Sequence, residues 1–191
     1  MRLSSKRVYL RRPAADDFDE LRDRYRASRR HFAGVARSEF DRARFDMMLS
    51  DAEKDSNEYF LVCLTSDDAI IGTLNFSQIF RRGFQNAYLG YQLFAGYTGH
   101  GYMTEAVAIG LRYAFEDLKL HRVEANVQPD NLASIGVLRR NGFCKEGFSP
   151  RYLKVGGRWR DHERWAILKE DRVSGKRNGG KHRQRSTRRP S

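Results

Sequence analysis

The residues most suggestive of chemistry form a glycine-rich turn within the stretch from Leu89 to Leu118. The turn reads Ala-Gly-Tyr-Thr-Gly-His-Gly and ends at Gly101; an apolar run precedes it, and a helical pattern follows it. The first N–H groups of a helix lack internal partners and lie at the positive end of the helix dipole, so they can bind phosphate oxygens. We therefore predict that this turn holds the pyrophosphate of a nucleotide-like cofactor.

Two common phosphate-binding motifs are absent from the turn. Thr104 stands where the third glycine of G-x-G-x-x-G would follow Gly99-His100-Gly101, and Leu120 and His121 stand where a ribose-binding acid is expected. No Gly-Lys-Ser/Thr occurs, which excludes a P-loop. A glycine-rich turn alone is more often structural, so the cofactor has to be identified from the rest of the chain.

The length and composition predict one globular domain that is large enough for a real core. The chain has 191 residues, 40% of them hydrophobic and 12% aromatic, and no run approaches the roughly 20 apolar residues that span a bilayer. Its first seven residues lack the apolar core of a secretory signal, so we expect a cytoplasmic protein without membrane contact. Cys63 and Cys144 are too few for a disulfide framework or a closed zinc site, and we expect both to be buried thiols.

The net charge of +12 is concentrated at the C-terminal end. From Arg172 to Ser191 there are eight Lys or Arg and no acid, which leaves +4 for residues 1–171. We predict a folded domain over residues 1–171 and a basic, disordered tail over 172–191, which cannot bury enough apolar surface to fold. The tail could contact RNA phosphates on the ribosome, or it could be a solvated terminus without a partner.

The N-terminal part of the chain predicts one strand and two helices. The strand covers residues 6–12 and ends at Pro13. Asp16 is the predicted N-cap of the first helix, and Ser38 with Asp41 has the outline of a capping box for the second. The apolar residues of the second helix are Phe40, Met47 and Met48.

The middle of the chain predicts three strands, at residues 59–64, 69–76 and 84–94, before the helix that leaves the glycine-rich turn. The core side of that helix is made up of Met103, Val107, Leu111, Ala114, Phe115 and Leu118. Ala106 and Gly110 leave a shallow groove on the same helix, which lets it lie close to a sheet.

The C-terminal part predicts a strand at residues 122–127, which should run parallel to the strand at 84–94 because a helix connects them. A short helix follows and ends at Gly142, and Gly156-Gly157 predicts the hairpin that leads into the last strand, at 159–168. The apolar residues of the short helix are Leu132, Ile135 and Leu138. The order of elements predicts an α+β fold with a mixed sheet and one parallel crossover, and not a doubly wound dinucleotide fold.

The turn and later segments resemble the GNAT superfamily of N-acetyltransferases. Thr98 to Ala106 resembles the acetyl-CoA loop of that superfamily, and Asn131-x-x-Ser134 with Asn141-Gly142-Phe143 resembles its next sequence block. Within the superfamily the chain is most similar to the RimJ/RimL type, which acetylates the N-termini of ribosomal proteins. The likeness to the RimJ branch is carried by Gly83-Phe84 through Leu89-Gly90-Tyr91, by Lys145-Glu146-Gly147, and by Gly157 to His162. The resemblance covers residues 7–169 and leaves the basic tail outside.

This resemblance implies the GNAT fold, with a central, mostly antiparallel sheet, one splayed pair of parallel strands, and helices on both faces. It implies acetyl-CoA as cosubstrate and no metal. The implied cofactor-binding residues are Tyr91, Gln92, Leu93, Gly99, His100, Gly101, Tyr102, Met103, Thr104 and Asn131. The amides of residues 99–104 would bind the pyrophosphate, the backbone of 91–93 would pair with the pantetheine arm, and an N–H near Leu93 would polarise the thioester carbonyl.

For the reaction itself, the resemblance implies that Ser134 protonates the departing CoA thiolate. His31 and Phe32 match a position near the acceptor groove. Each site residue also has a structural reading: Ser134 and Asn131 could only cap a helix, and His100 is more readily a backbone donor than a base.

The chain departs from the family pattern at several positions. These are Thr98 in place of Gln or Arg, Met103 in place of a small residue, Leu138 in place of a tyrosine acid, Asn126 in place of a strand glutamate, and Arg151 in place of the RimL-type glutamate. A free α-amino group has a pKa of about 7.7–8.0 and is roughly one-tenth neutral at pH 7, whereas a lysine at about 10.4 is almost fully charged. An enzyme without a strong base therefore favours an N-terminal acceptor, although Asp161 or Glu124 could act through water.

The leading hypothesis is direct transfer of acetyl from acetyl-CoA to a protein N-terminal α-amine, with the alanine N-terminus of a ribosomal protein as the expected partner. A second hypothesis keeps the fold but makes the acceptor a small amine, such as an antibiotic or a polyamine. A third is a non-enzymatic protein that binds ribosomal RNA through the tail.

Overall fold

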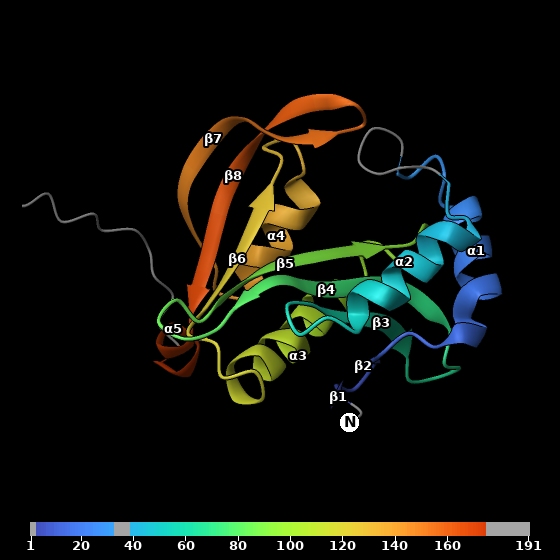
Figure 1. Cartoon of the computed structure of the whole chain (residues 1–191), viewed down its shortest axis with the longest axis horizontal. Helices are drawn as coiled ribbons and strands as arrows, with labels where there is room; N and C mark the ends of the chain where they lie inside the picture. Colours follow the sequence, from blue (N-terminus) through green and yellow to red (C-terminus); the bar gives the residue numbers. More distant parts are fainter. Residues whose placement is uncertain (1–2, 33–38, 175–191) are drawn as a thin grey trace, which may run out of the picture.

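The computed structural model of the chain describes residues 3–32 and 39–174, which form one eight-stranded sheet flanked by helices (Figure 1). The strands are β1 Leu3–Ser4, β2 Val8–Arg11, β3 Glu58–Leu64, β4 Ile70–Phe80, β5 Asn86–Leu93, β6 Arg122–Val127, β7 Cys144–Val155 and β8 Arg158–Leu168. The helices are α1 Phe18–Ala27, α2 Arg42–Ala52, α3 Tyr102–Glu116, α4 Leu132–Arg140 and α5 Lys169–Ser174, with a short 3₁₀ helix, η1, at Ala15–Asp17.

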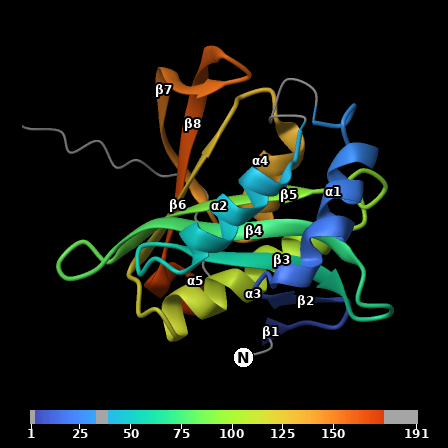
Figure 2. The same ribbon diagram turned by 45° about the vertical axis from the view of Figure 1, so that its right-hand side comes forward.

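The two faces of the sheet carry separate cores because side chains alternate along each strand. Val8 and Leu10 of β2 pack with residues of α3 and α4, whereas Tyr9 between them packs with residues of α1 and α2. On β3, Val62 faces α3, and Cys63 faces α1 and α2. The helices therefore cover both faces, α1 and α2 on one and α3 and α4 on the other, as predicted (Figure 2).

The strands lie in the order β1-β2-β3-β4-β5-β6-β8-β7, and each neighbouring pair is antiparallel except β5 and β6. The β5–β6 register joins only residues 86–88 to 122–124. Beyond that point β5 stays paired with β4, and β6 stays paired with β8, so the two strands diverge (Figure 1). The predicted mostly antiparallel sheet with one splayed parallel pair is confirmed.

The start of α1 differs from the prediction that Asp16 is its N-cap. The 3₁₀ helix η1 comes first, and the carboxylate of Asp17 accepts the N–H of Ala14 at 2.7 Å. Both oxygens of Asp17 also accept from the guanidinium of Arg11, at 2.7 and 2.5 Å. The prediction was wrong by one residue. Asp17, and not Asp16, points toward the protein because it pairs with Arg11 of β2, a contact that the local sequence pattern does not reveal.

Helix α2 begins later than predicted. Asp41 is its N-cap and accepts the N–H of Arg44 at 2.8 Å, while the predicted start at Ser38 lies outside the described residues. On this helix Phe45 is fully buried, whereas Met47 is 65% exposed. Of the apolar residues named for this helix, Met47 therefore lies outside its buried face.

The apolar Leu132 is exposed, and one of the two cysteines expected to be buried is not fully buried. Leu132 is the first residue of α4 and is 74% exposed, because the buried stripe of that helix is formed by Ile135 and Leu138. Cys63 is buried as expected, but Cys144, at the start of β7, is only half-buried.

Helix α5 extends to Ser174, so the predicted boundary at residue 171 falls inside this helix. Arg172 donates to the carbonyl of Ala108 at 3.4 Å and lies 3.7 Å from the carboxylate of Glu116. Residues 175–191, most of the predicted basic tail, lie outside the described residues. Across the part of the chain that the structure describes, no helix has the length and apolar character needed to cross a membrane.

The predicted close approach of α3 to the sheet is confirmed at Gly110. A Cβ atom there would lie 3.2 Å from both terminal methyl groups of Leu74 and 3.4 Å from the ring of Phe76. We expect Gly110→Val to destabilise the fold by about 1–3 kcal/mol, since overpacking a core costs that amount.

A denaturant titration of the variant measures this cost. The matched control is Gly136→Val in α4, where the three atoms nearest to an added Cβ all belong to the guanidinium of Arg140, which can move away. Equal stability of the two variants would show that α3 does not need its glycine.

Candidate active site

The loop between β5 and α3 has the backbone of an anion cradle. Gly96, Gly99 and Gly101 have φ angles of 88°, 83° and 81°, in the left-handed region that glycine tolerates. Gly101 is the N-cap of α3 and supplies no side-chain cap, and its carbonyl accepts the N–H of Glu105 at 3.2 Å. A Cβ atom on Gly99 would meet nothing within 4 Å. The loop therefore presents N–H groups at the positive end of a helix to open space, which suits a phosphate.

The diverging strands β5 and β6 leave a gap next to this loop. Two hydroxyl groups meet across it: the phenol of Tyr91 on β5 lies 2.7 Å from Oγ of Ser134, in the first turn of α4, and also donates to the Ser134 carbonyl at 3.2 Å. Burial raises the pKa of Tyr91 to about 12, so its hydroxyl keeps its proton at neutral pH. Ser134 can therefore accept a hydrogen bond from Tyr91 while donating its own proton to a ligand in the gap.

Asn131 fixes the turn that carries Ser134. Its side-chain oxygen accepts the N–H of Ser134 at 3.0 Å, and Asn131 is the N-cap of α4. The structural reading of Asn131 as a cap is thus confirmed. Ser134 itself caps nothing through its hydroxyl, which points to Tyr91.

The backbone of residues 91–93 pairs with β4 on one side only, through the register pairs Leu74–Tyr91, Thr73–Gln92 and Gly72–Leu93. Their other edge faces the gap, because the ladder with β6 has ended at Tyr88. The side chain of Gln92 points to the α1 side, where its amide donates to the hydroxyl of Tyr25. Backbone groups at the gap are thus placed to pair with an extended ligand.

On the opposite face of the sheet, the last pair before the gap is Tyr88 with Glu124. Glu124 accepts from Nε of Arg122 at 2.8 Å, and Arg122 also binds Glu146 of β7. Burial, followed by the nearby charge of Glu124, raises the pKa of the Tyr88 phenol. A carboxylate and a phenol therefore stand where the strands separate, on the face away from Ser134.

The other predicted water-mediated base, Asp161, lies elsewhere. It is on β8 beyond Glu163, the last residue of β8 that pairs with β6. Its carboxylate accepts the N–H of Arg151 at 2.7 Å, at an irregular point of β7 where φ of Arg151 is 50°. Asp161 therefore shapes the β7–β8 hairpin, and of the two candidate bases only Glu124 stands at the gap.

The structure separates the two predicted acceptor residues. Phe32 is buried, with its ring 5.8 Å from that of Tyr25 and 6.1 Å from that of Phe94, so it belongs to the core beneath α1 and α2. His31 is exposed, and its ring lies 5.1 Å from that of Phe32. Only His31 is available to an acceptor.

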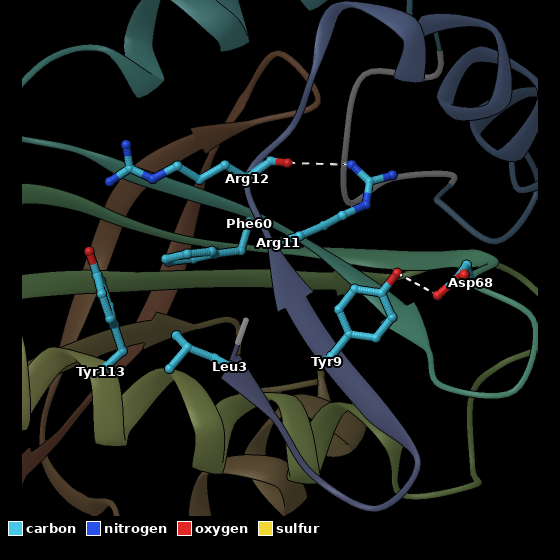
Figure 3. A pocket seen from close by; sticks show the side chains of 7 residues that line it. All are labelled: Leu3, Tyr9, Arg11, Arg12, Phe60, Asp68 and Tyr113. Carbon is cyan, nitrogen blue, oxygen red and sulfur yellow. Dashed lines mark hydrogen bonds between the residues drawn. The ribbon is translucent and has the colours of Figure 1, made fainter. Parts of the chain in front are cut away.

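A hollow of about 760 Å³ lies away from this gap, at the β1–β2 edge of the sheet (Figure 3). It is lined by Leu3, Tyr9, Arg11, Arg12, Phe60, Asp68 and Tyr113. Its polar groups bind one another or nearby acids: Tyr9 donates to Asp68 at 2.8 Å, and Arg12 and Tyr113 both donate to Glu58, at 2.7 and 2.9 Å. We therefore place the candidate active site at the gap and the glycine-rich loop, where the chemistry-bearing groups converge.

Comparison with known proteins identifies what this arrangement belongs to. Residues 7–144 match the family model described as an acetyltransferase (GNAT) domain. The chain belongs to the GNAT acetyltransferase family. It is therefore an N-acetyltransferase, and enzymes of this family use acetyl-CoA.

Three relatives give the detail. The chain is 34% identical over 185 residues to the [ribosomal protein uS5]-alanine N-acetyltransferase of Escherichia coli, covering 92% of this chain and 95% of that protein. It is 47% identical over 119 residues to the probable N-acetyltransferase YjcK of Bacillus subtilis, covering 62% of this chain and 66% of that protein. RimJ of Mycobacterium smegmatis, in complex with CoA-disulfide, matches with a TM-score of 0.76 and 30% identity over 85% of this chain and 82% of that one.

The residues of this GNAT domain fit a CoA molecule. The open space over Gly99 suits a phosphate, and the unpaired edge of β5 suits an extended arm. Sequence reasoning missed the side chain of Tyr91, to which only a backbone role had been assigned. Its partner Ser134 is 43 residues away, and no local pattern reveals that their hydroxyl groups meet.

Proposed function

We propose that this N-acetyltransferase acetylates the α-amine of a protein N-terminus, and that the alanine N-terminus of a ribosomal protein is its acceptor. The observation that carries the proposal is the similarity to the uS5-alanine enzyme, which extends over 92% of this chain and so includes the β7–β8 hairpin and α1 as well as the cofactor loop.

In this proposal the amides of residues 99–104 bind the pyrophosphate, and the free edge of β5 from Tyr91 to Leu93 pairs with the pantetheine arm. The thioester supplies an activated acetyl group. An N–H near Leu93 stabilises the negative charge that develops on the carbonyl oxygen. Ser134 then donates its hydroxyl proton to the sulfur as the C–S bond breaks. The phenol of Tyr91, 2.7 Å away, keeps its own proton and hydrogen-bonds to the serine oxygen while that oxygen gives up its proton. Ser134 recovers its proton from water after the products leave.

Transfer is direct, because neither cysteine is placed to carry the acetyl group. Cys63 is buried on β3 among residues of α1 and α2, and burial raises the pKa of its thiol, which disfavours the nucleophilic thiolate. Cys144 opposes Ala166 in the β7–β8 ladder, away from the β5–β6 gap. Both substrates must therefore be bound at the same time.

Glu124 is the proposed acceptor of the amine proton, through an ordered water. It lies on the sheet face opposite Ser134, so that the proton leaves the amine on one side of the gap and reaches the sulfur on the other. Because an α-amine is already partly neutral at pH 7, the base should contribute only modestly to the rate. We expect Glu124→Gln to lower kcat/KM by about tenfold at pH 7 and by less at pH 9, where more of the amine is neutral.

A pH series of kcat/KM on an alanine-starting peptide measures this effect, with Asp161→Asn as the matched control that should leave the profile unchanged. A pH-independent loss in Glu124→Gln would indicate that the residue holds the sheet and is not the base.

The acceptor is tested with purified protein, acetyl-CoA and three classes of amine. The proposal expects turnover of peptides that begin with alanine, and none of the same peptides with a blocked N-terminus and a free lysine. Preferred turnover of polyamines or amino-sugar antibiotics would establish the small-amine alternative. Mass spectrometry of ribosomal protein N-termini with and without the gene then identifies the acceptor in the cell.

The RNA-binding alternative is tested by ending the chain at Ser174, which keeps α5 complete. Loss of RNA binding with acetylation intact would separate a tail function from the enzymatic one. Loss of acetylation on every peptide would instead make the tail part of acceptor recognition.

A further inference from the structure

Arg7, between β1 and β2, reaches across to the first turn of α3. Its Nε donates to Glu105 at 2.7 Å, its Nη2 lies 2.5 Å from the same carboxylate, and its guanidinium lies 4.9 Å from the centre of the Tyr102 ring. Ser5 donates to the other oxygen of Glu105 at 2.8 Å. The β1–β2 hairpin thus places the Arg7 guanidinium against Glu105, although the two residues are 98 positions apart in the sequence.

This cation lies beside the cradle of the glycine-rich loop. A Cβ atom built on Gly101 would lie 3.3 Å from Nη2 of Arg7, and it would meet no other heavy atom within 4 Å. The guanidinium is therefore next to the residue that opens α3. Nη1 of Arg7 has no partner among the described residues, so Arg7 keeps donors for a ligand.

Partial burial acts to raise the pKa of Glu105, but the hydrogen bonds from Arg7 and Ser5 outweigh it, and the pKa is lowered overall. Glu105 is thus ionised at neutral pH. Without Arg7, a bare carboxylate would stand in the first turn of α3, one turn from the loop amides, and would repel an anion there.

We propose that Arg7 is a ligand of the cofactor pyrophosphate. The inference rests on the proposed binding of that group to the amides of residues 99–104. Glu105 and the Tyr102 ring orient the guanidinium, whose free N–H groups donate to phosphate oxygens, as arginine does at planar or forked oxygen pairs. Arg7 also offsets the charge of Glu105, which would otherwise oppose binding.

The test is calorimetric binding of CoA without acceptor. We expect Arg7→Gln to raise the Kd for CoA by about tenfold, a moderate loss because the Arg7 side chain is 45% exposed and water screens its charge. The matched control is Arg12→Gln, which removes another ion pair that ties the N-terminal strands to a neighbour, 2.7 Å from Glu58, but lies far from the loop. Its Kd should equal that of the unchanged protein.

The Glu105→Gln variant distinguishes a direct contact between Arg7 and CoA from a role of the Arg7–Glu105 pair that only supports α3. The glutamine oxygen can still accept from Arg7, so the guanidinium stays in place while the negative charge is removed. We expect CoA to bind Glu105→Gln as tightly as the unchanged protein, or more tightly. A loss as large as that of Arg7→Gln would overturn the proposal, because it would show that the pair only supports α3.

Dephospho-CoA completes the design, since it keeps the pyrophosphate and lacks the 3′-phosphate. The tenfold loss in Arg7→Gln should persist with this ligand; if it disappears, Arg7 serves the 3′-phosphate and the assignment is wrong. If the unchanged protein binds no CoA, the proposed function fails as well. If the unchanged protein and Arg7→Gln bind CoA equally well, only the role of Arg7 fails.

Discussion

Gly101→Val should abolish measurable CoA binding, with a loss of at least about 100-fold in affinity, or roughly 3 kcal/mol. Gly101 has φ of 81°, a conformation that a β-branched residue adopts only with strain, and an added Cβ would lie 3.3 Å from Nη2 of Arg7. Relaxing that strain would turn the loop amides away from the cradle and displace a neighbouring cation. Calorimetry with CoA measures the loss directly.

The matched control is Gly157→Val, in the turn between β7 and β8. Gly157 has the same φ of 81°, but an added Cβ would meet nothing within 4 Å. Both variants carry a similar backbone cost, so thermal unfolding should shift alike, whereas only Gly101→Val should lose CoA. Normal CoA binding by Gly101→Val would place the cofactor elsewhere.

Ser134→Ala should lower kcat by about 100-fold and leave the KM for acetyl-CoA nearly unchanged. A positioned proton donor contributes on the order of 10²–10⁴ to a rate, and the leaving sulfur is the atom that needs the proton. The cap made by Asn131 uses the backbone N–H of Ser134 and survives the substitution, so α4 should keep its start. Steady-state kinetics on a peptide acceptor tests the expectation.

Tyr91→Phe provides the companion measurement. If Tyr91 acts through the hydroxyl of Ser134, the single variant should lose less than Ser134→Ala, and the double variant should be no slower than Ser134→Ala alone. Full activity of Ser134→Ala would retire the serine as the acid. Independent losses in the two single variants would show that Tyr91 acts on the ligand directly.

The sequence was a good guide wherever a local pattern decides the structure. The glycine-rich turn, the helix after it and the strand at 122–127 could all be placed, because glycine tolerates the turn and a helical connection requires a parallel neighbour. The resemblance to the GNAT family supplied the splayed pair, which no periodicity could have shown.

The failures have a common cause in contacts between distant parts of the chain. Asp17 replaces Asp16 as the residue that organises the start of α1 because Arg11 binds it. For the site, Arg7 gave no signal as a ligand-binding residue, since its partner Glu105 is 98 residues away. Pairings of this kind are set by how the β1–β2 hairpin docks against α3.

The divergence of β5 and β6 places an open strand edge in the middle of a sheet. Strand edges at the rim of a protein invite other chains to add to them, and natural proteins protect themselves from such association. Here the open edge lies between two anchored halves, held by β4 on one side and by β8 beyond β6 on the other. A slender molecule can enter and form ladder-like hydrogen bonds, whereas a second polypeptide strand, with side chains on both faces, would have to force the halves apart. The open edge can therefore hydrogen-bond a narrow, extended ligand, while the anchored strands on either side hinder edge-to-edge pairing with another polypeptide.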